Sequence, residues 1–363
     1  MASGKGPFVY DVEGRKYTDY LLAFGPMILG HSHPEVVKRI EERAENGTMF
    51  GAPIEEEVKF GELIKRSSGL DRIRIVNTGT EATLHALRLS IFHTKRKKIL
   101  KIKGGYHGTH VYNYPSESVD EIDFNSAERA KESLEKKEYA AIIMEPIMGN
   151  AGVIMPKEGY LEEVQDLAHK AGTLFIMDEV ITGYRTSFSP YYKTHKLKPD
   201  LVTFGKIVGG GLPLAIYGGS ENIMNEVKPE GAFQQAGTYS ANPLSVAAGL
   251  ETLNLLKKKD YSRLKHMTEV SARELNKAGV TVNSATGMLS FFFTEKEVND
   301  LGDVNSSKHD LYLKFFRSML DAGIYLPAAY DESLFISFAH TEKQVRDSFS
   351  KMAEEVERIW KGK

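Results

Sequence analysis

The chain has 363 residues, of which 41% are hydrophobic and 26% are charged, as is ordinary for a globular protein. Its 47 Lys and Arg residues nearly balance its 49 Asp and Glu residues, so no long-range field favours a nucleic acid or an anionic membrane as partner. The absence of cysteine excludes disulfides, thiolate metal sites and a cysteine nucleophile. The first residues, MASGKGPFVY, contain no apolar signal segment, and no run reaches the roughly 20 apolar residues of a membrane helix. We therefore expect a cytoplasmic protein.

The first part of the chain predicts a β-hairpin with strands at 8–10 and 15–21, turning at Glu13-Gly14. Strands then alternate with helices. The expected strands are 72–77, 98–102, 140–145, 174–178, 201–204 and 214–218, and the expected helices are 34–46, 54–67, 81–94, 161–170 and 243–256. This alternation predicts an α/β fold with βαβ units and a mostly parallel sheet.

The pattern changes near residue 255, where shorter strands and longer helices follow. The expected strands are 279–282, 288–293 and 334–338, and the expected helices are 307–322 and 341–361. This arrangement predicts a smaller α+β domain. We expect a large domain at 46–254 and a small domain at 255–363, with residues 1–45 packing on the small one.

Two residues follow apolar strands at the edge of the sheet where ligands bind in open α/β folds. Asp178 ends such a strand, and a buried carboxylate there requires a partner, which could be a protonated pyridine nitrogen or simply Arg185. Lys206 follows the strand 201–204 and precedes Gly209-Gly210-Gly211, so it could act as a nucleophile or be a surface lysine beside a flexible loop.

Other polar residues lie at neighbouring strand ends. Gly79 and Thr80 could bind a phosphate at a helix start, although a plain Thr N-cap explains them equally well. Tyr106 and His107 follow the strand 98–102, where an aromatic ring could cover a flat heterocycle. Thr238 could be a further phosphate contact or belong to a helix start. The histidines at 31, 33, 107 and 110 match no zinc spacing, so we expect no metal.

Together these residues are the groups that pyridoxal 5′-phosphate (PLP) requires: donors for its phosphate, a carboxylate for its ring nitrogen and a Lys for its aldehyde. With them in place, the sequence resembles the class III PLP-dependent aminotransferases, and within that family the glutamate-1-semialdehyde 2,1-aminomutase branch. The matching stretches include NTGTEATLHALRL (77–89), KIKGGYHG (101–108), IMEPIMGNAGVIMP (143–156), MDEVITGYR (177–185), PDLVTFGKIVGGGLPLAIYGG (199–219) and QAGTYSANPLSVAAG (235–249).

The resemblance implies a fold-type I architecture and a role for each matching position. Lys206 matches the lysine that forms the Schiff base with PLP and transfers the proton, and Asp178 the partner of the pyridine nitrogen. The resemblance further implies Val180 under the ring, Tyr106 over it with His107 beside, Gly79 and Thr80 at the phosphate, Asn150 near the phenolic oxygen, and an active-site glutamate at Glu332. Thr238 matches a phosphate ligand donated by the second subunit, which implies a homodimer.

The sequence departs from the aminomutase branch in three places. It begins after the N-terminal element that binds the substrate carboxylate there, Phe24 stands where a Trp is usual, and only about 20 residues separate Tyr106 from the helix near Ser126, too few for the branch's long mobile loop. We therefore expect first an aminotransferase that acts between a small-molecule amino donor and a carbonyl acceptor. The alternatives are the aminomutase, an amino-acid racemase or epimerase, and a non-catalytic protein on the same scaffold.

Overall fold

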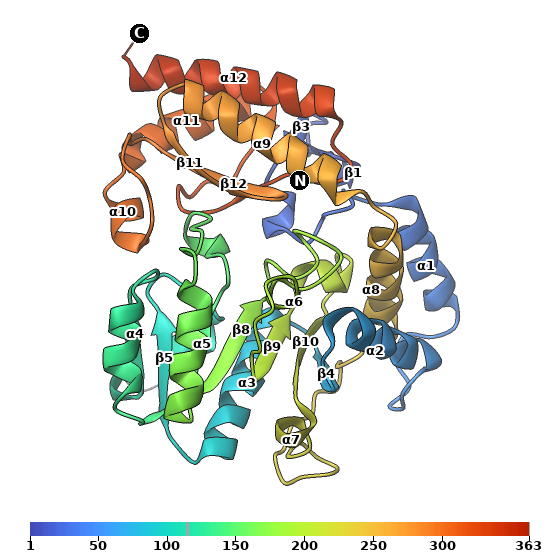
Figure 1. The fold of residues 1–363 in the computed structure, drawn as a ribbon. Helices are drawn as coiled ribbons and strands as arrows, with labels where there is room; N and C mark the ends of the chain where they lie inside the picture. The colour runs from blue at the N-terminus through green and yellow to red at the C-terminus, as the bar shows by residue number, and fades with distance from the viewer. Residues whose placement is uncertain (114–115, 363) are drawn as a thin grey trace. The chain divides into compact units, whose positions relative to one another are not determined.

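The computed structural model describes residues 1–113 and 116–362 (Figure 1). Its contacts define two compact units, which we describe separately. The large unit comprises Glu35–Pro146 and Pro156–Leu255, and the small unit comprises Met1–Pro34, Ile147–Met155 and Leu256–Lys363. The first division between these units falls after Pro34, and residues 147–155 belong to the small unit. The domain boundaries expected near residues 45 and 254 stay a prediction, because compact units are defined by contacts and not by function.

A seven-stranded sheet forms the centre of the large unit. Its order is β4 (Arg72–Val76), β10 (Ala215–Gly219), β9 (Leu201–Phe204), β8 (Leu174–Glu179), β7 (Tyr139–Met144), β5 (Lys98–Ile102) and β6 (Val119–Ile122). All neighbours from β9 to β6 pair in parallel, which confirms the expected α/β fold with a mostly parallel sheet. Only β10 runs antiparallel, because the short link 205–214 from β9 leaves no room for a crossover helix.

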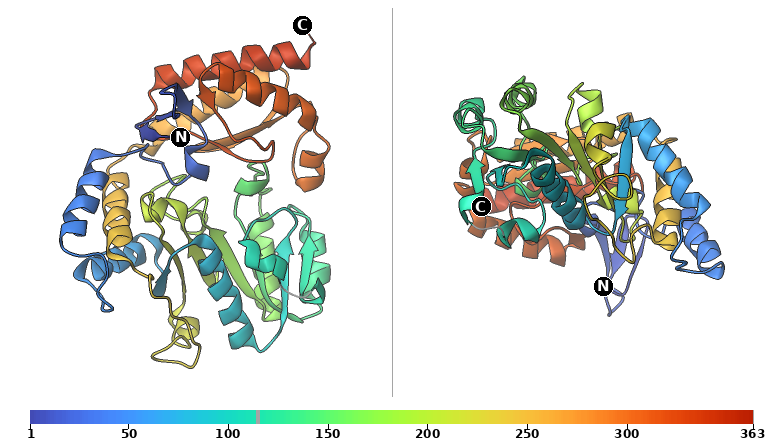
Figure 2. Two further views of the ribbon diagram at one scale, coloured as in Figure 1. Left: turned by 180° about the vertical axis from the view of Figure 1, so that it is seen from behind. Right: turned by 90° about the horizontal axis from the view of Figure 1, so that it is seen from below.

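Helices cover both faces of this sheet. They are α1 (Pro34–Glu45), α2 (Glu55–Ser68), α3 (Gly79–Thr94), α4 (Ala127–Leu134), α5 (Tyr160–Ala171), α6 (Tyr191–Thr194), α7 (Glu221–Met224) and α8 (Pro243–Leu256). Helix α3 packs on β7, β9 and β10 through Ala82, Ala86 and Leu89, and Figure 2 shows α5 on the opposite face. The first turn of α3 therefore lies at the carboxyl edge of the parallel strands.

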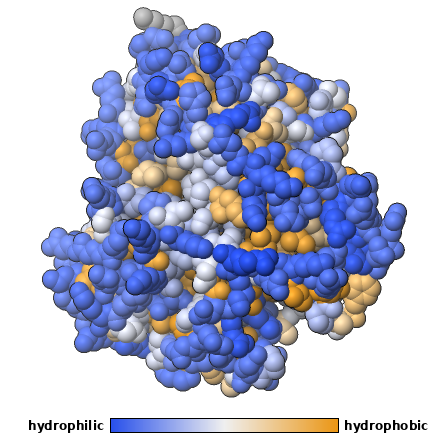
Figure 3. Space-filling view, turned by 45° about the vertical axis from the view of Figure 1, so that its right-hand side comes forward, coloured by the Kyte–Doolittle hydropathy of each residue, from blue (hydrophilic) through white to orange (hydrophobic). Residues whose placement is uncertain are grey.

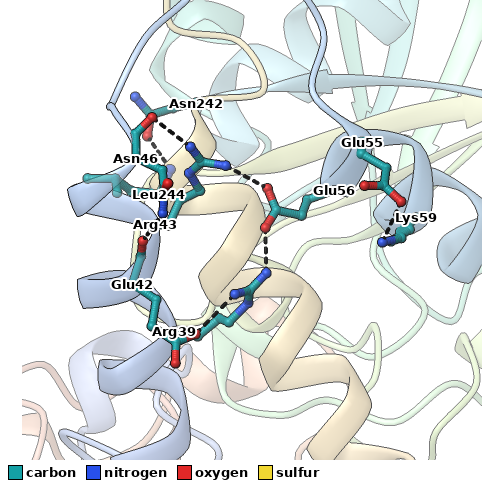
Figure 4. A network of polar contacts seen from close by, with 9 residues as sticks. All are labelled: Arg39, Glu42, Arg43, Asn46, Glu55, Glu56, Lys59, Asn242 and Leu244. Carbon is teal, nitrogen blue, oxygen red and sulfur yellow. Dashed lines mark hydrogen bonds and ion pairs between the residues drawn. The ribbon is translucent and has the colours of Figure 1, made fainter.

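A network of polar contacts fixes the segment between α1 and α2 (Figure 4). Glu56 pairs with both Arg39 and Arg43, the latter with Nη1 3.2 Å from the carboxylate. Asn242 caps α8 by accepting the Leu244 N–H at 3.0 Å, and its amide nitrogen donates to the Thr48 carbonyl at 3.3 Å. The ion pairs of Glu56 thus join α2 to α1, and the Asn242 amide holds Thr48 beside the start of α8.

The small unit has two sheets of its own. The first has the order β1 (Ser3–Lys5), β2 (Phe8–Tyr10), β3 (Lys16–Asp19) and β13 (Ile324–Tyr325), and the second has β11 (Thr281–Ala285), β12 (Met288–Phe292) and β14 (Leu334–Phe335). Its helices are α9 (Tyr261–Lys277), α10 (Leu301–Asn305), α11 (His309–Asp321) and α12 (Glu342–Trp360). The expected β2–β3 hairpin is present, whereas α9 was not predicted, although Leu264, Met267 and Leu275 recur at helical spacing on its buried face.

One face of the molecule is predominantly polar. Most side chains on the face drawn in Figure 3 are hydrophilic, with hydrophobic residues scattered among them. Within residues 1–113 and 116–362, no helix is long and apolar enough to cross a membrane.

Candidate active site

A cavity of about 140 Å³ opens at the carboxyl edge of the parallel strands in the large unit. Its lining comes from the start of α3 and from the ends of β5, β7, β8 and β9. The lining residues are Gly79, Thr80, Thr83, Tyr106, His107, Gly108, Glu145, Asp178, Val180, Ile181 and Lys206. The cavity thus brings together all the predicted cofactor residues except Asn150 and Thr238.

The start of α3 forms one end of the cavity. Thr78 is the N-cap, because its hydroxyl oxygen accepts the Glu81 N–H at 3.2 Å. Thr80 therefore does not cap the helix, and Gly79 and Thr80 occupy the first turn, where backbone N–H groups have no partner within the helix. Such a turn binds a phosphate readily. The hydroxyl of Thr83 donates to the His107 carbonyl at 2.6 Å and ties this turn to the loop after β5.

Glycines bring the backbone close to the cavity floor. A Cβ on Gly79 would lie 2.9 Å from a methyl group of Val180, and a Cβ on Gly205 would lie 3.1 Å from the same methyl group. Gly108 has a φ of +91°, and a Cβ there would meet Thr80 at 2.7 Å. A side chain at Gly79 or Gly108 would therefore overlap Val180 or Thr80, and one at Gly205 would crowd Val180, as expected where backbone must closely approach a ligand.

Asp178 is a buried side chain whose carboxyl group has three hydrogen-bond partners. It is 3% exposed, and His107 Nδ1 lies 2.7 Å from its Oδ2. Its Oδ1 accepts the hydroxyl of Thr203 at 2.8 Å and the Val180 N–H at 3.1 Å. Among the described residues, His107 is its only ion-pair partner, and Arg185 donates Nε–H to the Ile181 carbonyl instead. The ion pair with Arg185 that the sequence left open is not among the ion pairs that the described residues form.

The surroundings of Asp178 suit a cation supplied by a ligand. Burial, with His107 nearby, lowers the pKa of His110 to about 4, so His110 adds no positive charge at neutral pH. Because a carboxylate only accepts hydrogen bonds, His107 Nδ1 carries the proton of this contact. Within the described part of the chain, no Lys or Arg forms an ion pair with Asp178, and a buried carboxylate of this kind that faces a cavity fits a protonated ring nitrogen. The chemistry of these residues therefore fits PLP.

Lys206 lies directly after β9 and lines the same cavity. Its φ is +46°, in the left-handed region that a side chain with a Cβ rarely adopts. Residues held in this conformation cluster at functional sites. The backbone geometry therefore favours a functional lysine over a surface lysine beside a loop.

Two acidic residues at neighbouring strand ends differ in their surroundings. Glu145 follows β7, is 4% exposed, lines the cavity and accepts the Tyr106 N–H at 3.3 Å. Glu179 points away from Asp178 and accepts the N–H groups of Tyr191 and Tyr192 at 2.7 and 2.8 Å. Burial raises the pKa of Glu179 to about 7. Glu145 is thus a site residue that we did not predict, although its place after an apolar strand resembles that of Asp178.

Other predicted residues lie outside the cavity. Thr238 lines a separate, open hollow of about 860 Å³ in the large unit, with Met49 and Phe50 on its wall. Its neighbour Tyr239 is 64% exposed. Asn150 and Glu332 belong to the small unit, so their roles in the site stay predictions.

The fold and the cavity define a fold-type I PLP-dependent transferase. The family profile described as "Aminotransferase class-III" matches residues 1–118 and 110–352. The chain therefore belongs to the class III aminotransferases, which confirms the expected family, a PLP-dependent enzyme that acts on small molecules.

Individual relatives agree with this assignment. The chain is 42% identical to a glutamate-1-semialdehyde 2,1-aminomutase from Thermoplasma volcanium, over 95% of this chain and 89% of the relative. It is 40% identical to an enzyme of the same name from Lysinibacillus sphaericus, over 95% and 87%.

Solved structures show the same fold at lower identity. An omega-transaminase from Sphaerobacter thermophilus superposes with a TM-score of 0.91 at 22% identity, covering 98% of this chain and 90% of that one. A glutamate-1-semialdehyde aminomutase from Pseudomonas aeruginosa gives a TM-score of 0.86 at 21% identity, covering 98% and 87%.

Proposed function

We propose that the protein is a glutamate-1-semialdehyde 2,1-aminomutase, the alternative that the sequence analysis placed second. The observation that supports this proposal is identity of about 40% to enzymes of that name over nearly the whole chain. The name states the net change: the amino group leaves C2 for C1 while the carbonyl oxygen leaves C1 for C2. No external amino donor or acceptor is consumed.

The residues of the cavity have separate tasks in this proposal. Bound PLP would supply an electron sink that stabilises negative charge on the substrate carbon. Lys206 Nζ would hold the cofactor aldehyde and then move the proton between the substrate carbon and cofactor C4′. Asp178 would keep the ring nitrogen protonated, and the first turn of α3 would bind the phosphate. Tyr106 would cover the ring from the face opposite Val180.

Transfer between two different molecules is the second candidate. The alignment with the Thermoplasma volcanium enzyme extends over 375 positions but uses 95% of 363 residues, about 345, so about 30 positions have no residue here. The segment after Tyr106 is short, and β6 already occupies Val119–Ile122 of it. An active site that is more open to solvent would release the intermediate of the first half-reaction more readily, which favours transamination.

One assay separates the two candidates. The PLP-loaded and pyridoxamine-phosphate-loaded proteins are incubated with glutamate-1-semialdehyde without any acceptor, and product is counted per active site. An aminomutase gives many turnovers with at least one of these forms. Product that stops near one equivalent would contradict the aminomutase and support a transaminase, and scrambled chirality without carbonyl product would indicate a racemase.

The assignment of Lys206 is tested independently of the reaction. Borohydride reduction of the PLP-loaded protein, followed by digestion and mass spectrometry, is expected to find the cofactor on the peptide that contains Lys206. Label on another lysine would disprove the site, whatever the substrate. The Lys206→Ala variant is the control, and it should carry no label.

A further inference from the structure

Thr203 is an unusual residue for its position in the sheet. Strand β9 has the sequence Leu-Val-Thr-Phe, and all four residues are buried, with Thr203 0% exposed. Valine has almost the same shape and would fill this space without a polar atom. A buried hydroxyl is costly unless it is hydrogen-bonded, so Thr203 requires a polar partner.

That partner is Asp178. Strands β8 and β9 are parallel, and their register places Asp178 directly beside Thr203, so both side chains leave the sheet on the same face. The Thr203 hydroxyl donates to Asp178 Oδ1 at 2.8 Å. Among the residues that the structure describes, this is the hydrogen bond that accounts for the Thr203 side chain.

The donors around Asp178 leave one direction open. A carboxylate oxygen accepts about two hydrogen bonds. The hydroxyl of Thr203 and the N–H of Val180 fill Oδ1, whereas Oδ2 is contacted, among residues 1–113 and 116–362, by His107 alone. One acceptor position therefore remains, on Oδ2, in a residue that lines the cavity.

We propose that Thr203 is a positioning residue: by occupying Oδ1 it turns Asp178 so that Oδ2 meets the cofactor's ring nitrogen, and it favours the ionised carboxylate. This inference rests on the proposed role of Asp178. A donor to a carboxylate stabilises the anion, so without Thr203 the carboxylate takes a larger share of the proton that lies between it and the ring nitrogen.

The test compares Thr203→Val with Thr203→Ser in the holoenzyme. Loss of one hydrogen bond to a charged group corresponds to a factor of about ten or more. We expect Thr203→Val to raise the dissociation constant of PLP about tenfold and to move the ¹⁵N signal of ring-labelled PLP towards the neutral pyridine value. Thr203→Ser keeps the hydroxyl and should stay within about twofold of the parent protein in affinity.

A second buried threonine provides the matched control. Thr173 is 1% exposed and donates to the Tyr139 carbonyl at 3.2 Å, away from the cavity lining. Thr173→Val should lower thermal stability yet leave PLP affinity and the ¹⁵N signal unchanged. If Thr203→Val is not recovered folded, Thr203→Cys, whose thiol is a weak donor, is expected to show the same changes to a smaller degree.

The possible results distinguish a failure of the proposed role of Thr203 from a failure of the proposed role of Asp178. If Asp178→Asn changes the ¹⁵N signal but Thr203→Val, or Thr203→Cys in its place, does not, Thr203 has no positioning role and the cofactor site stands. If Asp178→Asn also leaves the ¹⁵N signal and the PLP affinity unchanged, the proposed role of Asp178 is contradicted, and with it the role of Thr203 that depends on it.

Discussion

Gly79 and Gly61 are two helical glycines that face different surroundings. A Cβ on Gly79 would lie 2.9 Å from Val180, whereas a Cβ on Gly61 would meet nothing closer than Ile73 at 3.8 Å. We therefore expect Gly79→Ala to displace Val180 in the cavity wall. Because overpacking costs about 1–3 kcal/mol, the dissociation constant of PLP should rise about tenfold. Titration of the apoenzyme with PLP measures this change.

Gly61→Ala is the control for that substitution. It lies inside α2, where replacing Gly by Ala stabilises a helix by up to about 1 kcal/mol. Cofactor affinity should not change. Equal PLP affinities for the parent protein and Gly79→Ala would show that Val180 can move to accommodate the methyl group. The close approach of Gly79 to Val180 would then have no role in binding.

At the same scale, the sequence identified residues by their place at strand ends. Lys206, Asp178 and Tyr106 meet in one cavity because the carboxyl ends of parallel strands share one edge. Thr203 was not predicted, because its contact with Asp178 depends on the register of β8 and β9, and the sequence of each strand alone does not reveal that register. The N-cap role of Thr78, rather than Thr80, likewise depends on the residue at which the helix begins.

At the scale of elements, Glu179 connects β8 to the start of α6 through the N–H groups of Tyr191 and Tyr192. Burial raises its pKa in the folded protein to about 7, above its value of about 4.5 when unfolded. The folded state therefore binds more protons between these values, and this residue's contribution to stability falls as pH rises from about 4.5 to about 7.

The matched comparison is Glu179→Gln, which keeps one acceptor oxygen and cannot ionise. Across pH 5 to 8, the melting temperature of the parent protein should fall relative to that of Glu179→Gln as pH rises. Thermal scans of both PLP-loaded proteins in the same buffers measure the difference. A difference that is constant with pH would mean that Glu179 does not titrate in this range.

The elements themselves were predictable to different degrees. Strands β5 and β9 and helix α8 match their expected ranges, because apolar runs and turn residues bound them clearly. Strand β6 was not predicted, because Val119-Asp120-Glu121-Ile122 is short, half charged and lies at the sheet edge. Its charged side chains pair with residues of β5: Lys101 Nζ lies 2.6 Å from the carboxylate of Glu121. This ion pair depends on the pairing of the two strands, which the sequence of β6 alone does not indicate.

At the scale of the whole molecule, Thr238 lies outside the cavity that it is expected to serve. We propose that Thr238 is donated to the site of a second copy, which would account for this placement. Mixing Lys206→Ala and Thr238→Ala subunits should then restore activity, because a hybrid dimer has one site with both native residues. Random exchange predicts about a quarter of parental activity from two nearly inactive proteins.

Activity is measured after partial unfolding and reassociation of the mixture, with each variant treated alone as the control. Recovery no greater than the sum of the separate variants, with dimers present by light scattering, would show that Thr238 serves its own subunit or none. Residue pattern alone does not distinguish a Thr238 that serves its own subunit from one that serves a partner, so only the resemblance suggested a second subunit.

The left-handed backbone of Lys206 has a consequence for how the protein changes over generations. Glycine and asparagine adopt a φ of +46° more easily than lysine, so the fold alone would favour either of them at position 206. A screen that rewards only heat resistance should therefore enrich replacements of Lys206. With the role proposed for Lys206, such replacements would abolish activity, and lysine at this position would reflect selection for chemistry against selection for stability.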